Sequence, residues 1–153
     1  MSASQSTVIS MRLPAESGKR LKRLANRHGW TTSDASARLV EEGLRRSEFA
    51  FIDFRDTAAG RQACLQGSSL AVWEIKMLLR SYNGNAAAVA SHLHWPVVKI
   101  TAAIQYAEAY PEEIESALEE NDAMDFQALR RMLPQATELK VGRQTARSQK
   151  TSG

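Results

Sequence analysis

Residues 6–14 read Ser6-Thr7-Val8-Ile9-Ser10-Met11-Arg12-Leu13-Pro14, and this stretch decides the fold of the N-terminal part of the chain. Successive side chains of a β-strand point to opposite faces of the strand. One face would therefore carry the apolar residues Ile9, Met11 and Leu13. The other face would carry Val8, Ser10 and Arg12. The alternation predicts a short strand with one face available for burial.

Two helices are expected after this strand. Pro14 ends the strand and suits a helix start, so the first helix is predicted from about Ala15 to His28, where Gly29 ends it. Its surface is basic and includes Lys19, Arg20, Lys22, Arg23 and Arg27. Thr31-Thr32-Ser33-Asp34 has the pattern of a capping box and starts a second helix that runs to about Arg46. Residues available for burial on this helix are Ala35, Leu39, Val40, Gly43 and Leu44.

The predicted strand has no partner within its own module. A segment of about forty residues cannot bury enough apolar surface alone, and an isolated strand is not stable. Both problems disappear if two copies pair their strands antiparallel and interlock their helices. The segment is therefore expected to form an obligate homodimer through its N-terminal strand.

This arrangement resembles the ribbon-helix-helix superfamily of Arc- and MetJ-like repressors and antitoxins. The resemblance rests on Ile9-Ser10-Met11-Arg12-Leu13-Pro14, on Gly29-Trp30-Thr31-Thr32-Ser33 and on Leu39-Val40-Glu41-Glu42-Gly43-Leu44, and it covers nearly a third of the chain. It implies a two-stranded ribbon that enters the major groove of double-stranded DNA. An alternative interpretation is an ordinary dimer interface beside a solvated basic helix.

The resemblance also implies which residues contact DNA. Val8, Ser10 and Arg12 would face base edges, with Arg12 as the candidate for guanine O6 and N7. Val8 departs from the polar residue expected there, although it could contact a thymine methyl group. The N–H groups around Thr31, Thr32 and Ser33, at the start of the second helix, would bind a phosphate.

The distribution of charge fits an N-terminal module that binds a polyanion. The whole chain has a formal net charge of +3. Residues 1–47 hold nine Lys/Arg against four Asp/Glu, a balance of +5. Residues 48–121 hold five against ten, a balance of −5, and residues 122–153 hold six against three, a balance of +3. Segments of opposite charge are expected to bind different partners.

Residues 48–121 are expected to form a second module. Residues 48–54 and 62–66 read as two strands of a hairpin, with Ala58-Ala59-Gly60 as the turn. Helices follow from about Leu70 to Tyr82, after Asn85, after Pro96 and from Pro111. The predicted buried faces consist of Leu70, Trp73, Met77 and Leu78, then Val89, Ala90 and Leu93, then Val97, Ile100, Ile104 and Ala107. The tight turn His94-Trp95-Pro96 suggests a helix-turn-helix core.

This second module resembles the small VapB-type antitoxin domain, which has a hairpin followed by a helix-turn-helix core. The resemblance rests on Gly60…Gly67-Ser68-Ser69-Leu70-Ala71-Val72 and on Val98…Ala102-Ala103-Ile104-Gln105-Tyr106. A role in DNA binding is less expected here than dimerisation or protein docking. The helix after Pro96 carries Lys99 as its one cation, and an acidic segment repels phosphates.

Residues 122–153 are predicted to hold one short amphipathic helix, residues 125–133, followed by a disordered basic tail. The apolar side of this helix would consist of Phe126, Leu129, Met132 and Leu133. These residues are candidates for docking a toxin, because antitoxins often fold such a segment onto their toxin. Packing of the helix on its own domain, or a DNA-binding tail, are the alternatives.

Several protein classes are not expected. The chain of 153 residues has no apolar run long enough to span a membrane and no secretory signal at its start. Its single cysteine, Cys64, fits a reducing cytoplasm. The three histidines, His28, His92 and His94, lack further ligands at metal-site spacing, and no catalytic motif is present. We therefore expect a cytoplasmic protein without enzymatic activity, metal or other cofactor.

The sequence as a whole predicts a mainly α-helical, DNA-binding transcriptional repressor with modules at residues 6–47, 48–121 and 122–153. In one reading it is the antitoxin of a toxin–antitoxin system, which represses its own operon and neutralises a toxin, with a PIN-like nuclease as the candidate. In the other it is a stand-alone transcription factor whose middle domain serves oligomerisation or ligand sensing.

Overall fold

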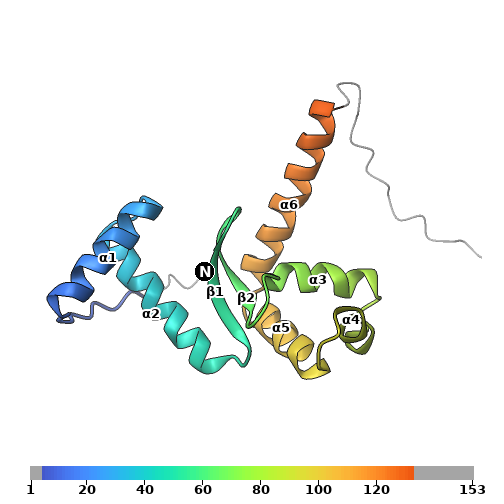
Figure 1. Ribbon diagram of the computed structural model, residues 1–153, viewed down its shortest axis with the longest axis horizontal. Helices are drawn as coiled ribbons and strands as arrows, with labels where there is room; N and C mark the ends of the chain where they lie inside the picture. Colours follow the sequence, from blue (N-terminus) through green and yellow to red (C-terminus); the bar gives the residue numbers. More distant parts are fainter. Residues whose placement is uncertain (1–4, 133–153) are drawn as a thin grey trace, which may run out of the picture. The chain divides into compact units, whose positions relative to one another are not determined.

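The computed structural model describes residues 5–132, and it describes side chains for residues 5–123. This part of the chain holds six helices and one two-stranded hairpin (Figure 1), so the prediction of a mainly α-helical chain is confirmed. Of the described residues, 5–109 belong to one compact unit, and Tyr110 begins a second.

The first two helices have nearly the predicted bounds. Helix α1 spans Ala15–His28 and helix α2 spans Thr32–Glu48. Gly29 ends α1 in the left-handed conformation, with φ of 68°, and the Trp30 N–H donates to the Ala25 carbonyl at 2.9 Å. Glycine adopts this conformation without the steric penalty of a Cβ atom. A single tight turn therefore joins the two helices.

The predicted N-terminal strand is not formed within one chain. Residues 5–14 have no regular secondary structure, and all of their side chains are exposed. A strand is defined by hydrogen bonds to a neighbouring strand, and a single copy offers none to this segment. The pairing of two such segments in a dimer therefore stays a prediction.

The predicted hairpin is present, but its first strand is shifted. Strand β1 spans Ile52–Thr57 and pairs antiparallel with strand β2, Gly60–Leu65, with Thr57 opposite Gly60. The sequence had placed the first strand at residues 48–54. That placement was wrong because α2 continues to Glu48, and the chain reverses at Phe51, whose φ is 60°.

Three helices follow the hairpin, as expected. They are α3, Val72–Ser81, α4, Ala86–Leu93, and α5, Val97–Ala109, and α3 and α4 both pack against α5. The Asn85 side chain caps α4 by accepting from the Ala88 N–H at 3.1 Å, as the sequence indicated. His94, with φ of 56°, ends α4 and leads into the turn before α5.

The predicted buried faces of α3 and α5 need correction. Met77 and Val97, both expected in the core, are 41% and 50% exposed. The buried side chains of these helices are Val72, Ile75 and Leu79 on α3, and Ile100, Ala102, Ala103, Tyr106 and Ala107 on α5. Most residues of these helices are apolar or small, so the spacing of apolar residues did not define which face is buried. The prediction for α4 was better, since Val89 and Ala90 are buried.

The second unit contains one helix where two had been predicted. Helix α6 spans Pro111–Met132 without interruption, so the separate helix expected at residues 125–133 is the last part of a longer one. No proline or glycine occurs between Pro111 and Met132, and nothing in that stretch would end a helix. The predicted disordered tail lies outside the described residues.

Cys64 offers a simple check of this fold. It is fully buried on β2, and burial raises the pKa of its thiol. The reactive thiolate should therefore be scarce and shielded. We expect a thiol reagent to label native Cys64 at least about tenfold more slowly than the urea-unfolded chain. A variant with Cys64→Ala and the exposed replacement Ser91→Cys is the control, and it should react at the unfolded rate in both states. Equal native rates in the two proteins would contradict the burial of β2.

Candidate nucleic-acid interface

The three candidate base-reading residues all lie on the extended segment before α1. Val8, Ser10 and Arg12 are exposed, with Val8 at 92%. The apolar residues between them are exposed as well, with Ile9 at 76% and Met11 at 54%. A segment with alternating apolar residues has one face to bury, and in a single chain that face is in water.

The helices beside this segment also leave apolar surface in water. An open groove of about 500 Å³ lies along α1. Its lining consists of the apolar residues Leu13, Leu21, Leu24 and Leu39, with Ser17, Arg20, Arg23 and Arg27. Val40 and Leu44 of α2, which the sequence offered for burial, are 47% and 50% exposed. The surfaces that a single copy leaves open are therefore continuous from the N-terminal segment to both helices.

The candidate phosphate-binding residues lie together at the start of α2. Thr31, Thr32 and Ser33 are all exposed. The Thr31 hydroxyl accepts from the Asp34 N–H at 3.0 Å, which confirms the predicted N-cap. Within residues 5–132, the N–H groups of Thr32 and Ser33 donate to no acceptor. Such groups at a helix start attract anions, because the helix dipole adds to their partial charges.

The basic residues of α1 are placed for long-range attraction. Lys19, Arg20, Lys22, Arg23 and Arg27 are exposed. Lys19 forms an ion pair with Glu16 at 3.1 Å, and the other four form none with the described part of the chain. Unpaired cations at a surface are available for the phosphates of DNA, whose neutralisation dominates affinity.

The turn between α1 and α2 is held by a stack of side chains. The ring of Trp30 lies parallel to the ring of His28, with centroids 4.2 Å apart. The guanidinium of Arg38, two turns along α2, lies 4.5 Å from the centre of the Trp30 ring. Trp30 therefore combines an aromatic stack with His28 and a cation–π contact with Arg38.

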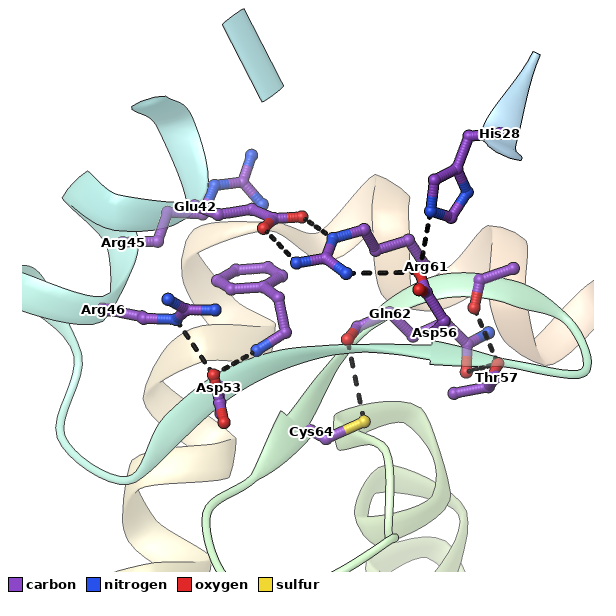
Figure 2. A network of polar contacts seen from close by, with 12 residues as sticks. His28, Glu42, Arg45, Arg46, Asp53, Asp56, Thr57, Arg61, Gln62 and Cys64 are labelled. Carbon is purple, nitrogen blue, oxygen red and sulfur yellow. Dashed lines mark hydrogen bonds and ion pairs between the residues drawn. The ribbon is translucent and has the colours of Figure 1, made fainter. Parts of the chain in front are cut away.

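A buried ion pair joins α2 to the hairpin (Figure 2). The guanidinium of Arg61, on β2, donates through Nε and Nη2 to the two carboxylate oxygens of Glu42, with the Nη2 bond at 2.8 Å. Glu42 is 8% exposed. A two-point contact of this kind fixes orientation as well as distance. The hydrogen bonding that Arg61 donates to Glu42 raises the pKa of Arg61 further above its usual value, so Arg61 is charged at every accessible pH.

The same guanidinium extends the network to the end of α1. Arg61 Nη1 donates to Asp56 Oδ1 at 3.2 Å, and His28 Nε2 lies 3.3 Å from the same oxygen (Figure 2). The His28 contact is within ion-pair distance but lacks the angle of a hydrogen bond, so this buried nitrogen has no hydrogen-bond partner in the described chain. The hairpin therefore contacts both helices that flank the turn.

Two further contacts attach the end of α2. Arg46 forms an ion pair with Asp53 of β1 at 2.9 Å (Figure 2). Arg45 Nη1 donates to the Tyr106 hydroxyl of α5 at 2.7 Å. Tyr106 is fully buried, and the ring of Phe49 meets it edge-on at 5.4 Å. The end of α2 is thus attached to the hairpin and to α5 by charged and aromatic side chains.

The sequence interpretation missed Glu42 and Arg61. Glu42 was grouped with the second helix only as part of a family pattern, and Arg61 was not singled out. A signal was present in the spacing of Ala35, Leu39, Glu42 and Arg46, which follows the 4-3-4 pattern of a buried helical face. Two charged residues on such a face indicate that charged partners lie opposite them.

The second module presents little that could attract DNA. The one cation of α5, Lys99, lies over the ring of Trp95, with Nζ 4.1 Å from the ring centre. Val97 and Val98 at the start of that helix are 50% and 54% exposed. The toxin-docking candidates Phe126, Leu129 and Met132 have side chains outside the described residues, as does the whole of Leu133.

Other kinds of site were also sought. The described side chains include no group of three or more His, Cys, Asp or Glu residues that could hold a metal ion. Among residues 5–132, every helix is too short or too polar to cross a lipid bilayer. No known protein family, curated protein sequence or solved structure gives a match to this chain.

The buried ion pair has a measurable effect on stability. Removing one partner of such a pair leaves an uncompensated charge, so Glu42→Ala should lower the free energy of unfolding by about 3 kcal/mol. The control is Glu41→Ala, whose carboxylate is 53% exposed and pairs with Arg45 on the same helix. An exposed pair contributes little, so this variant should lose less than about 1 kcal/mol. Urea denaturation at one protein concentration measures both, and equal losses would contradict the burial of the Glu42 carboxylate.

Proposed function

We propose that the chain is a dimeric, sequence-specific DNA-binding repressor that contacts DNA through residues 8–12 and the start of α2. The observation that carries the proposal is the exposed N-terminal segment. It has an apolar face with no partner in one chain, and it precedes a helix with four unpaired basic residues. A second copy would cover the apolar face, and DNA would neutralise the basic surface.

Strand pairing between two copies supports this use of the segment. Two antiparallel segments would satisfy each other's backbone N–H and C=O groups and form a ribbon narrow enough for the major groove. Ile9, Met11 and Leu13 would then face the helices of the dimer. Val8, Ser10 and Arg12 would face outward to the base edges, where Arg12 can donate two hydrogen bonds to guanine.

Phosphate contacts would fix the ribbon in register. The unbonded N–H groups of Thr32 and Ser33 provide an anion site at the start of α2. A dimer carries two such sites, one on each side of its ribbon. Contacts of this kind position a protein on the duplex, while the ribbon distinguishes the sequence.

The antitoxin role is a finer proposal and rests on the resemblance of residues 48–121. In this proposal the second module and residues 124–133 bind a toxin, and the head represses the operon that encodes both proteins. Co-expression with the product of the adjacent small reading frame tests it. Formation of a stable complex that removes a nuclease-like toxicity would support the antitoxin role, and no complex would favour a stand-alone transcription factor.

Dimerisation through the N-terminal segment can be tested in the full chain. Ile9→Asp would place a charge on the apolar face of each strand, and two such charges would oppose each other across the dimer. We expect this variant to sediment as a monomer at concentrations where the unmodified chain is a dimer. Val97→Asp is the control because Val97 is also apolar and half exposed, but on α5. A dimer that persists in Ile9→Asp would place the interface elsewhere.

Base reading by Arg12 predicts a loss of specificity. Arg12→Ala should weaken binding to the DNA upstream of its own gene by about 1–3 kcal/mol, and much less to a scrambled duplex. Arg55→Ala removes the same charge from the exposed side of β1 and serves as the control. Fluorescence anisotropy at two salt concentrations measures all of these affinities. An equal loss on both duplexes would make Arg12 a phosphate contact.

A further inference from the structure

The contacts around the turn between α1 and α2 form a closed ring. Trp30 stacks on His28, and His28 lies against Asp56. Asp56 accepts from Arg61, which binds Glu42 of α2. Arg38, one helical turn before Glu42 on α2, lies over the Trp30 ring and closes the ring of contacts. Two of the residues in this ring, Asp56 and Arg61, come from the hairpin, and the rest come from the two helices and the turn. Figure 2 shows the part of the ring formed by His28, Asp56, Arg61 and Glu42.

We propose that the hairpin is a positioning element of the DNA-binding surface, in which Asp56 and Arg61 hold the turn so that the first N–H groups of α2 point at a phosphate. The inference rests on the proposed DNA-binding function and deepens it. Asp56 and Arg61 do not contact DNA in this proposal. They act through His28, Glu42 and the Trp30 ring.

The Trp30 side chain belongs to the same turn as the candidate phosphate-binding N–H groups. Thr31, the residue that follows Trp30, caps α2, and Thr32 and Ser33 carry the unbonded N–H groups. The Trp30 ring is therefore only two or three residues from the groups that would bind phosphate. A hydrogen bond weakens steeply when its angle falls below about 120°, so a small rotation of this turn would reduce phosphate binding.

The ring of contacts resists that rotation from both directions. His28 is the last residue of α1, and Arg38 and Glu42 lie on α2, so a movement of either helix against the other shifts one side of the stack. Asp56 and Arg61 face each other across the hairpin register, so β1 and β2 move as one piece. The two-stranded hairpin thus contacts α1 at its last residue, His28, and α2 in its second half, at Glu42.

The test uses the full chain with Asp56→Asn, which keeps the shape of the side chain and an oxygen acceptor for Arg61 but removes the charge near His28. Asp53→Asn is the matched control. It makes the same change on the same strand and weakens another ion pair to α2, that with Arg46, which lies outside the ring. Arg61→Lys is a second variant, since it keeps the charge but cannot hold Glu42 at two points.

Two measurements separate a positioning role from general destabilisation. The first is hydrogen exchange at the Trp30 and Asp34 amides, whose bonds to Ala25 and Thr31 report the shape of the turn. The second is the salt dependence of binding to the upstream DNA. We expect faster exchange at both amides in Asp56→Asn and Arg61→Lys. We also expect about tenfold weaker binding and a salt slope smaller by about two phosphate contacts per dimer, one for each turn. Asp53→Asn should change neither quantity.

Each contrary result has a distinct meaning. Unchanged exchange in Asp56→Asn and Arg61→Lys would show that the hairpin does not hold the turn and would overturn the inference. Faster exchange with an unchanged salt slope would overturn it too, because the turn would then move without affecting phosphate contacts. Equal effects in Asp53→Asn would reduce the role to overall stability and would also overturn it. If the unmodified chain shows no preference for the upstream DNA, the proposed function itself fails, and the exchange data still decide whether the hairpin supports the turn.

Discussion

The ion pair between Glu42 and Arg61 is the contact on which the arrangement of residues 5–109 depends. Taking both charges out of water is costly, and a two-point contact recovers much of that cost only when its geometry is good and the remaining hydrogen-bonding positions are used. Here the third nitrogen of the guanidinium is used by Asp56, and Asp56 lies against His28. The pair therefore specifies how the hairpin meets α2 more than it adds stability, because an apolar contact of the same size would permit several orientations. A charged pair with two matched hydrogen bonds permits one.

Whereas the groups of this ion pair have partners within one chain, residues 5–14 lack such partners within one copy. Their backbone groups have no strand to pair with, and Ile9, Met11 and Leu13 are in water. An apolar stripe on an unpaired edge favours association with another chain. The groove along α1 and the exposed Val40 and Leu44 show that the helices also leave apolar surface in water, which favours association in the same way. One copy is thus complete in residues 52–109, where the hairpin and three helices bury their apolar residues, and incomplete in residues 5–48.

The accuracy of the sequence-based prediction followed the kind of signal in each segment. Helix ends were predicted well where one residue has a strong local preference, as for Gly29 after α1 and Asn85 before α4. The faces of α3 and α5 were predicted poorly because most of their residues are apolar or small, so periodicity could not distinguish Met77 from Ile75. The interface candidates Val8, Ser10, Arg12 and Thr31–Ser33 came from the resemblance to ribbon-helix-helix proteins; all of them are exposed, and their roles stay predictions. The ring around Trp30 could not be predicted, because Asp56 and Arg61 are distant in sequence from His28 and Glu42, and no local preference links them.

A module can contribute to DNA binding by attracting phosphates directly or by positioning another element that does so. The distribution of charge indicates which of these two contributions each module could make. Attraction to phosphates requires available cations, and α1 has four that form no ion pair with the described chain. On α5 the one cation lies over Trp95, and Val97 and Val98 occupy the exposed start of that helix. Arg61, the cation of β2, is used by Glu42 and Asp56. Direct attraction from this second module is therefore weak, and its effect on DNA binding has to act through the position of α2. Because α2 carries the proposed phosphate-binding N–H groups at one end and the contacts to the hairpin and α5 towards the other, it is the element through which such an effect would pass.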